Sequence, residues 1–390
     1  MSMLVGGTAG DYAGEMDPRP YYWVSTAGHP NFGDEFITAS WLRYLAQASP
    51  DNEVWLDCPE PGLASVLFEG LHPRLRVTNT LWRAVREAAD HGEDVAGHVV
   101  RLVREQGSPR YDLGLLKLRE VQSLHLLGGG FINGIWPQHA ALLDGMRAVH
   151  GLTGARLYAT GQGLMPLPGP PAEARKLFRD FAHASVRDAE SAAASSARLG
   201  LDDAFLGAEA VSARGNGPPG IYVCIQSDLA DRATFEAAVA QARALIGYAG
   251  RFGRAYYLEA IPGVDHPAYR QLADLIPQDR FIPFAGVWTG GLPVGPDQLW
   301  ITTRFHFHLL AAAAGARGVA LVSRRGYYDV KHASLAALGS GWTLLAPDAT
   351  PGRRSIPWKR GSLHRRLPAL AARKHAEASA LYGDGPLPGQ

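Results

Sequence analysis

The sequence predicts an α/β protein of two parallel-sheet, Rossmann-like domains that face each other across a cleft. Strand-like segments alternate with segments of helical periodicity, and hairpin signals are few, which is typical of parallel sheets. The chain has 390 residues, a length that favours two hydrophobic cores over one. The glycine- and proline-rich stretch "SARGNGPPG" (212–220) separates two such α/β series and predicts a linker.

Each half of the chain shows its own pattern of strands and helices. The first half is expected to hold a helix over 36–48 and a helix that ends at Gly200. The expected strands are "YYWVST" (21–26), "NEVWLDCP" (52–59), "SLHLLGGGFIN" (123–133), "ARLYATGQGLMP" (156–167), "IYVCIQ" (221–226), "QLWITT" (298–303) and "GVALVS" (318–323). The expected parts of the chain are a mobile N-terminal segment (1–20), an N-terminal α/β domain (21–212), a linker (213–220), a C-terminal α/β domain (221–345) and a basic tail (346–390) that crosses back to the first domain.

The composition excludes several classes of protein. Lys and Arg total 38 against 37 Asp and Glu, and the resulting net charge of +1 argues against general nucleic-acid binding. Two cysteines, with no C-x-x-C or H-E-x-x-H pattern, predict neither a disulfide framework nor a metal site. The N-terminus lacks the pattern of a secretory signal, and the longest apolar stretch is interrupted by Gly315, Arg317 and Gly318. We therefore expect a cytoplasmic protein.

The polar residues that could carry chemistry follow the ends of predicted strands. In open parallel sheets, ligands bind beyond the carboxyl ends of the strands, near the free N–H groups of helix N-termini. The sequence therefore predicts that these residues converge on one cleft. They are Asn31, Asp34, Gly128, Gly129, Gly130, Gly161, Gly163, Arg187, Arg304, His306 and Lys331.

Each of these residues also has an ordinary structural interpretation. Asp34 could cap a helix that begins near Phe36, and Thr303 could cap the alanine-rich helix that follows it. Arg187 could form a surface pair with Asp188, which would contribute little stability. Taken singly, these interpretations are favoured. The position of all the residues at the same edge of the sheets favours a functional site.

The glycines, Lys331 and the two histidines have their own alternatives. The glycine runs could make tight turns only, since neither matches G-x-G-x-x-G, and Lys331 could be exposed to solvent. His306 and His308 in "TTRFHFHLLAAAAG" (302–315) are two residues apart, about 200° around a helix. Both cannot face one site within the helix, so one of them is expected to be structural.

Six motifs, spread from about residue 21 to about residue 340, resemble the polysaccharide pyruvyl transferase family. They are "NFGDEFI", "LHLLGGGFI", "YATGQGLMPL", "SVRDAESA", "TTRFHFHLLAAAAG" and "YYDVKHASLAALG". The resemblance implies a two-domain fold like the GT-B glycosyltransferases. It also implies transfer of pyruvate from phosphoenolpyruvate onto two sugar hydroxyls as a ketal, in polysaccharide biosynthesis for the cell envelope. The family pattern carries over to Asp34, Arg187, Arg304, His306 and Lys331, and it has no counterpart of His308.

The sequence departs from the family pattern at two places. Arg324 and Arg325 stand where an apolar strand end is more usual, and Glu209 stands where the family more often has an aspartate. Both departures bear on the acceptor.

The chemistry implied by the resemblance needs the residue types that the motifs supply. Phosphoenolpyruvate carries a carboxylate and a phosphate, which Arg187, Arg304 and Lys331 could bind. The methylene carbon must be protonated, and His306 beside two anionic groups fits a general acid. Asp34 could accept or orient the hydroxyl protons of the acceptor. Phosphoenolpyruvate is then the co-substrate, and no metal or redox cofactor is expected.

Two other functions remain open from the sequence. A GT-B glycosyltransferase would use the same cleft and glycine loops to hold a nucleotide sugar, and a non-catalytic sugar-binding subunit could keep the fold. The acceptor sugar could be lipid-linked or nucleotide-linked. A basic segment (353–374) could contact anionic lipid at the inner membrane face, although a solvated helix face is the simpler interpretation. Its cations are Arg353, Arg354, Lys359, Arg360, Arg365, Arg366, Arg373 and Lys374.

Overall fold

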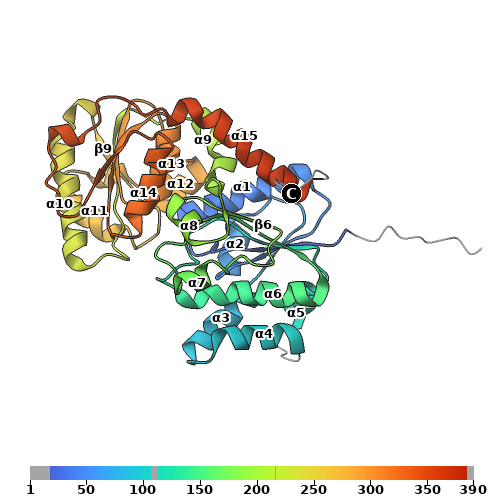
Figure 1. Cartoon of the computed structure of the whole chain (residues 1–390). Helices are drawn as coiled ribbons and strands as arrows, with labels where there is room; N and C mark the ends of the chain where they lie inside the picture. The colour runs from blue at the N-terminus through green and yellow to red at the C-terminus, as the bar shows by residue number, and fades with distance from the viewer. Residues whose placement is uncertain (1–17, 107–111, 216, 384–390) are drawn as a thin grey trace, which may run out of the picture.

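Two parallel sheets, one in each half of the chain, form the framework of the protein (Figure 1). The structure is a computed structural model that describes residues 18–106, 112–215 and 217–383. Most of the expected mobile segment (1–20) therefore lies outside the described residues. The first sheet has seven strands in the order β3-β2-β1-β4-β5-β6-β7, and the second has six in the order β10-β9-β8-β11-β12-β13. Their neighbouring strands pair in parallel, so the predicted fold class is confirmed.

The strands are short and most are buried on both faces, as expected for sheets covered by helices. Those of the first sheet are β1 (Tyr21–Val24), β2 (Val54–Asp57), β3 (Leu75–Thr78), β4 (Ser123–Leu126), β5 (Arg156–Gln162), β6 (His183–Val186) and β7 (Arg198–Leu199). Those of the second sheet are β8 (Gly220–Cys224), β9 (Ala255–Leu258), β10 (Phe281–Ile282), β11 (Gln298–Thr302), β12 (Arg317–Leu321) and β13 (Thr343–Leu345).

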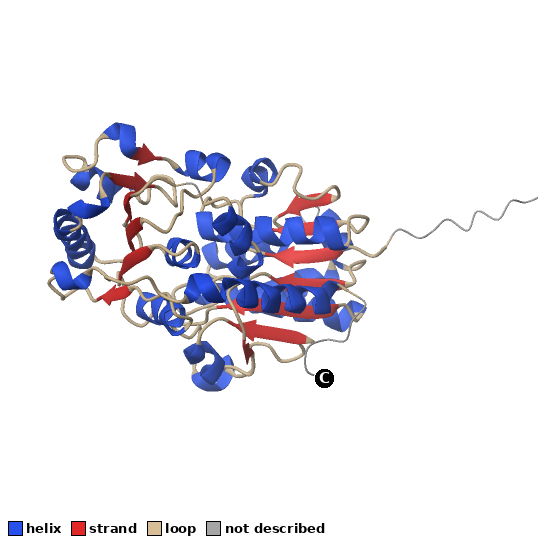
Figure 2. Ribbon diagram, turned by 90° about the horizontal axis from the view of Figure 1, so that it is seen from above, coloured by secondary structure: helices blue, strands red, loops and turns tan. Residues whose placement is uncertain are grey.

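Helices connect successive strands and lie on both sides of the sheets (Figure 2). In the first half they are α1 (Phe32–Ala48), α2 (Pro61–Leu67), α3 (Thr80–Asp90), α4 (Val95–Glu105), α5 (Asp112–Leu118), α6 (Ala141–Thr153), α7 (Pro171–Ala174), α8 (Ala189–Ala194) and α9 (Ala208–Ala213). In the second half they are α10 (Arg232–Tyr248), α11 (His266–Leu272), α12 (Phe284–Gly290), α13 (Phe305–Ala313), α14 (Tyr328–Ala337) and α15 (Leu363–Tyr382). The 3-10 turns are η1 (Pro137–Ala140), η2 (Asp203–Leu206), η3 (Gly250–Phe252), η4 (Gln278–Arg280) and η5 (Arg353–Ser355).

The strand order brings four loops together. In the first sheet the winding reverses between β1 and β4, and in the second it reverses between β8 and β11. Ligand sites of open parallel sheets form beyond the carboxyl ends of the strands at such reversals, because the two neighbouring loops diverge there. The loops after β1, β4, β8 and β11 all contribute to one pocket, which therefore lies at the reversal points of both sheets.

The largest buried cluster is shared by the two halves of the chain. It contains Trp23 of β1 and Trp41 of α1 together with Trp300 of β11 and Phe307 of α13. Separate clusters cover the outer face of the first sheet, beneath α3, α4 and α6, and the outer face of the second, beneath α10 and α11. The shared cluster packs α1 against α13, which places the N-termini of these two helices near each other.

Two helix boundaries differ from the sequence prediction. Helix α1 begins at Phe32 and not near Phe36, because Asn31 is its N-cap: Oδ1 of Asn31 accepts a hydrogen bond from the backbone N–H of Gly33 at 3.3 Å. The interpretation of Asp34 as the cap is therefore wrong. Helix α8 ends at Ala194, well before Gly200, and a short strand, β7, follows it. Strand pairing with β6 outweighs the helical pattern there.

Helix α15 runs back from the second half of the chain to the first domain (Figure 1). Its last residue, Tyr382, is buried among aromatic side chains of the first domain. The Tyr382 hydroxyl accepts a hydrogen bond from Nε1 of Trp23 at 2.7 Å and lies 2.7 Å from Nδ1 of His125. These contacts connect α15 to β1 and β4.

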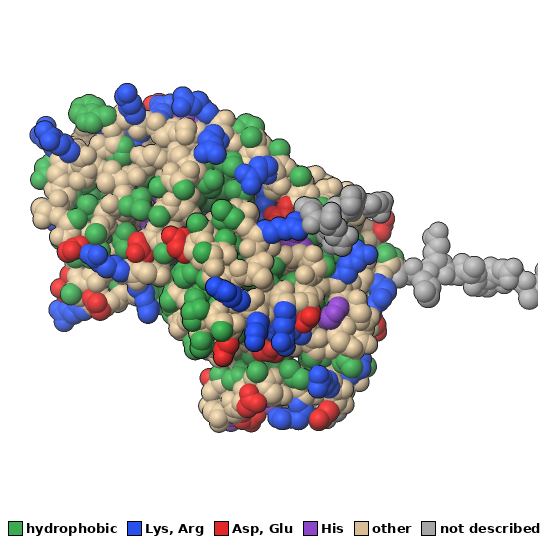
Figure 3. All heavy atoms as spheres, in the orientation of Figure 1, with side chains coloured by type: hydrophobic (Ala, Val, Ile, Leu, Met, Phe, Trp, Pro, Cys, Tyr) green, Lys and Arg blue, Asp and Glu red, His purple; other side chains and the backbone are tan. Residues whose placement is uncertain are grey.

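The basic tail is less available to a membrane than its composition indicates. Lys374 is fully buried, so its inclusion among the lipid-facing cations is wrong. Arg360 forms an ion pair with Asp297 at 2.7 Å, whereas Arg353, Arg365 and Arg373 are exposed. Basic side chains on the visible face are mixed with apolar and acidic ones (Figure 3). No helix in the described part of the chain has the length and apolar character needed to cross a bilayer.

Tyr382 allows the docking of α15 to be tested. Tyr382→Phe keeps the ring contacts but removes the partner of two buried nitrogen atoms, on Trp23 and His125. Because buried donors without partners are costly, we expect the free energy of unfolding to fall by about 1–3 kcal/mol. Urea unfolding measures the change. An unchanged midpoint and slope would show that these hydrogen bonds contribute no net stability.

Candidate active site

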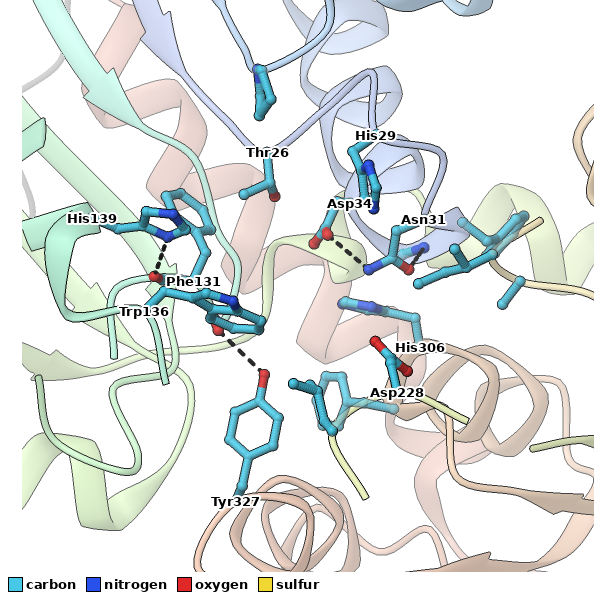
Figure 4. A pocket seen from close by; sticks show the side chains of 18 of the residues that line it. Thr26, His29, Asn31, Asp34, Phe131, Trp136, His139, Asp228, His306 and Tyr327 are labelled. Atoms are coloured by element: carbon cyan, nitrogen blue, oxygen red, sulfur yellow. Dashed lines mark hydrogen bonds between the residues drawn. The ribbon is translucent and has the colours of Figure 1, made fainter. Parts of the chain in front are cut away.

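A pocket of about 480 Å³ lies between the two sheets. Thr26, His29 and Asn31 line it from the loop after β1, and Asp228 and His306 line it from the second half of the chain (Figure 4). Of the eleven residues predicted from the sequence, seven line this pocket: Asn31, Asp34, Gly130, Arg187, Arg304, His306 and Lys331. The tertiary structure thus brings together residues that are up to 300 positions apart (31 to 331).

The N-terminus of α1 positions Asp34. Nδ2 of Asn31 donates a hydrogen bond to Oδ2 of Asp34 at 2.8 Å, while the other end of the same amide caps the helix. Asp34 and Asn31 therefore lie side by side at the pocket wall (Figure 4). Gly33 between them faces the His306 ring so closely that a β-carbon at this position would overlap it. Glycine in the N-x-G-D loop is therefore required by the approach of α13.

Arg187 is buried at the end of β6 and pairs with an acidic residue that the sequence analysis did not identify. Its Nη1 donates to Oδ2 of Asp202 at 2.7 Å, and its guanidinium lies over the ring of Phe305, 4.5 Å from the centroid. The predicted alternative, a surface pair with Asp188, is wrong, because Asp188 caps α8 by accepting from the N–H of Ser191. Nε of Arg187 is buried and has no hydrogen-bond partner among the described residues.

Asp202, in the first domain, also faces His306 of α13 in the second domain. Nε2 of His306 lies 3.3 Å from Oδ1 of Asp202, within ion-pair distance although no hydrogen bond forms. Burial alone would raise the pKa of Asp202, but the charges of His306 and Arg187 outweigh it and hold the pKa well below its ordinary value. The carboxylate therefore remains ionised between the Arg187 guanidinium and the His306 ring.

Arg304 is the residue that directly precedes α13, and its backbone forms the N-cap. Thr303 does not cap the helix, contrary to one sequence interpretation, because its hydroxyl accepts from the N–H of Gln226 at 3.0 Å. The Arg304 guanidinium forms an ion pair with the fully buried Asp265 and lies 3.9 Å from Asp228. Burial lowers the pKa of Arg304, but Asp265 outweighs burial and raises it, so this arginine stays charged.

Lys331 is buried, which rules out the solvent-exposed interpretation. Its ammonium lies 3.5 Å from the ring centroid of Tyr327, and it forms no ion pair with a described residue. Burial, and then the positive charge of Arg187, lowers the pKa of Lys331 well below its ordinary value. A bound anion would reverse this effect and favour the ammonium form.

The five predicted glycines have different positions. Gly130 lines the pocket, and a β-carbon there would lie 2.9 Å from both Nη2 of Arg187 and Nζ of Lys331. Gly163 packs against the guanidinium of Arg187, and Gly129 forms an isolated β-bridge with Gln162 of β5. Gly128 and Gly161 lie against Asp203 and do not line the pocket. The glycine loops therefore form turns and also leave space for the side chains of Arg187 and Lys331.

His308 lies away from the pocket, as the helical geometry predicts for one of the two histidines. It is fully buried, its ring stacks on Trp342 at 4.2 Å, and its Nδ1 lies 3.0 Å from Nδ1 of His332. Burial, followed by His332, lowers the pKa of His308 well below its ordinary value, so the ring is neutral. His308 is a core residue.

An aromatic wall on the first domain faces these polar residues and was not predicted from the sequence (Figure 4). It consists of Trp82, Phe131, Trp136 and His139. The rings of Trp136 and His139 are stacked with centroids 6.0 Å apart, and Trp82 meets His139 edge-on at 4.8 Å. Trp82 lies on the buried face of α3, which packs on the core of the first domain, and this core ends at the pocket.

The positions at which the sequence departs from the family pattern lie outside this pocket. Arg324 and Arg325 are exposed, and Arg325 pairs with Asp348 at 2.6 Å. Glu209 lines a second cavity, of about 950 Å³, on the other side of α1. The departures from the family pattern therefore do not change the polar residues of this pocket.

The fold and the pocket place the protein in the class of two-domain α/β proteins that have a polar site between two parallel sheets. The sequence model of the polysaccharide pyruvyl transferase family matches residues 31–324, and the chain belongs to that family of transferases. No curated protein sequence matches the chain significantly.

Solved structures resemble the chain only distantly. One is HepE of Anabaena in complex with UDP and glucose, with 12% identity over 93% of this chain and 95% of that chain, and a TM-score of 0.44. Another is the UDP-GlcNAc 2-epimerase of Neisseria meningitidis bound to UDP-GlcNAc, with 8% identity over 92% and 94% of the two chains, and a TM-score of 0.47.

The lowered pKa of Asp202 predicts a pH-dependent contribution to stability. A carboxyl whose pKa is depressed by folding stabilises the protein above its ordinary pKa of 3.8, and this contribution is lost as the pH falls below that value. Asp202→Asn should therefore cost about 3 kcal/mol or more at pH 7 and about 1 kcal/mol less at pH 3. Urea unfolding of both proteins gives the difference at each pH. A difference that does not change with pH would contradict the ion pairs of Asp202.

Proposed function

We propose that the protein transfers pyruvate from phosphoenolpyruvate onto two hydroxyls of a sugar as a ketal and releases phosphate. The observation that carries this proposal is the convergence of Arg187, Arg304 and Lys331 on one pocket. Among the described residues, two of these cations, Arg187 and Arg304, have a buried nitrogen atom without a hydrogen-bond partner, and Lys331 forms no ion pair. A small ligand with a carboxylate and a phosphate would satisfy all three.

The proton donor in this proposal is His306. Asp202 lies on the Nε2 side of the ring, and the opposite nitrogen, Nδ1, faces Gly33 in the pocket wall. A carboxylate on one ring nitrogen stabilises the imidazolium and orients the other nitrogen for proton transfer. Nδ1 would then protonate the methylene carbon of phosphoenolpyruvate, which makes the adjacent carbon electrophilic.

The remaining steps balance without a change in oxidation state. One sugar hydroxyl adds to the electrophilic carbon, the bond between this carbon and the phosphate oxygen breaks, and the second hydroxyl closes the ketal. One of the two hydroxyl protons restores the protonated form of His306, and the other leaves with the phosphate. Asp34, held by Asn31, would accept or orient a hydroxyl proton. We propose that this chemistry needs no redox cofactor and no metal.

The aromatic wall is the proposed acceptor side of the pocket. The C–H faces of a sugar ring pack well against aromatic rings, and Trp136 and Trp82 offer such surfaces beside His139. Burial lowers the pKa of His139, and its Nδ1 lies 3.0 Å from the carbonyl oxygen of Phe131, so a neutral ring is fixed in place. The acceptor would thus lie between this wall and Asp34, with its hydroxyls toward the donor.

Phosphate release from phosphoenolpyruvate, tested against nucleotide-linked and lipid-linked sugars, is the direct test of this function. Thermal shifts with phosphoenolpyruvate and with a nucleoside diphosphate separate it from the glycosyltransferase alternative, because only the former is expected to raise the melting temperature of the parent. A shift with the nucleotide alone would overturn the proposal. Vesicles of anionic lipid at low salt would test contact of the exposed tail cations with a membrane.

The two histidines of α13 predict opposite outcomes. His306→Ala should lower phosphate release by about 10²–10⁴-fold, the usual contribution of a positioned general acid, and should leave phosphoenolpyruvate binding intact. His308→Ala should lower the melting temperature, because it opens a cavity against Trp342, with a much smaller effect on turnover. Initial rates and thermal unfolding of both variants provide the comparison. Equal losses of activity in the two variants would mean that both histidines only pack the helix.

Lys331 is predicted to act through binding. Lys331→Met should raise the KM for phosphoenolpyruvate by about tenfold or more and change kcat less, because a point charge stabilises the bound substrate and the transition state alike. Since burial and the charge of Arg187 lower the pKa of Lys331, the parent should take up a proton when it binds the anion, and the variant should not. Calorimetry in two buffers measures this uptake. An unchanged KM would remove Lys331 from the anion site.

A further inference from the structure

A fully buried lysine connects helix α15 to the back of the active site. Lys374 and its partner Asp203 are both completely shielded from solvent and form an ion pair. The same ammonium donates to Oε2 of Glu377 at 2.6 Å and to the carbonyl oxygen of Leu201 at 3.2 Å. The buried ammonium of Lys374 therefore has three oxygen neighbours, as burial of a charged amine requires.

Asp203 extends this contact into the first sheet. Its carboxylate accepts hydrogen bonds from Nε1 of Trp41 at 2.7 Å, the N–H of Gly128 at 2.8 Å and the hydroxyl of Thr160 at 2.6 Å. Gly128 begins the glycine loop whose third residue, Gly130, lies against Arg187 and Lys331 in the pocket. Asp203 therefore fixes both the glycine loop and the start of η2.

The contacts of Lys374 lie on both sides of Asp202. It holds the backbone of Leu201 before this residue and the side chain of Asp203 after it. Asp202 projects into the site, where its two oxygens meet Arg187 and His306. A shift of the turn 201–203 would move both oxygens with respect to the proton donor and the anion-binding arginine.

We propose that Lys374 is a positioning residue of the active site: from α15 it fixes the turn 201–203 and the glycine loop, so that Asp202 holds Arg187 and His306 in place. Helix α15 then takes part in the function of the pocket, although none of its residues lines the pocket. The kinetic consequence rests on the proposed function, whereas the structural consequence does not.

The structural consequence is tested by amide hydrogen exchange. In Lys374→Met, the segments 127–131 and 201–206 should exchange about tenfold faster or more. The reason is that Asp203, which accepts from the N–H of Gly128, is no longer held by Lys374, and the carbonyl oxygen of Leu201 loses its donor. Tyr382→Phe is the matched control: it also weakens the docking of α15 but leaves the Lys374–Asp203 contact intact. Parent-like exchange of both segments in Lys374→Met, or equal acceleration in the control, would overturn the proposal.

Lys374→Met leaves two buried carboxylates without their cation and could fail to fold. The second variant, Lys374→Met with Glu377→Gln, removes one of these charges, while Asp203 keeps its donors from Trp41, Gly128 and Thr160. The same exchange pattern is expected for it.

The kinetic test is a double-mutant cycle with Asp202→Asn. If Lys374 acts through Asp202, Lys374→Met should lower kcat by about 10²-fold in the parent, and by less than about twofold when Asp202→Asn is already present. Tyr382→Phe should leave kcat within about twofold of the parent. If the losses in kcat caused by Lys374→Met and by Asp202→Asn multiply in the double variant, Lys374 has a merely structural role, and the inference is overturned. If the parent releases no phosphate with any acceptor, the proposed function fails, and hydrogen exchange alone decides the role of Lys374.

Discussion

The carboxylate of Asp202 is the contact on which the geometry of the site depends, because it is buried between a side chain from each domain. Arg187 at the end of β6 binds one oxygen, and His306 at the start of α13 approaches the other. An ion in this position tolerates little movement, since separation of the domains would leave a buried charge with too few partners. The absence of a side chain at Gly33 allows α1 and α13 to approach closely enough for the contact to form.

Buried carboxylates keep two cations of the pocket charged and in place. Arg187 and Arg304 each have a buried carboxylate of their own, Asp202 and Asp265, which keeps them ionised and fixed. Lys331 forms no such ion pair with a described residue, and burial beside Arg187 lowers its pKa. An anion bound beside Lys331 would offset this effect and favour the ammonium form.

The fold divides the pocket between the two domains. The first domain supplies Asp34, Arg187 and the aromatic wall, whereas the second domain supplies Arg304, His306 and Lys331. The network behind the turn 201–203, in which Lys374 and Asp203 are buried, shows that the pocket is also supported from a helix at the far end of the chain.

The sequence by itself determined the fold class, the polar residues at the strand ends and the separation of His306 from His308. These properties follow from local patterns: alternation of strands and helices, glycine at tight turns, and the angle of about 100° between successive helical residues. The partners of those residues could not be predicted. Nothing near Arg187 in the sequence indicates that Asp202, and not Asp188, would bind it.

Only the tertiary structure decided which polar residues are buried and which of them meet. Lys331 and Lys374 are both lysines in helices, with the same expectation of exposure, yet one lines the pocket and the other supports it from behind. The aromatic wall gave no signal either, because a tryptophan in an amphipathic helix looks the same whether it packs on the core or on a cavity. Such distinctions depend on contacts between distant segments, which burial and the order of the strands determine and local sequence does not.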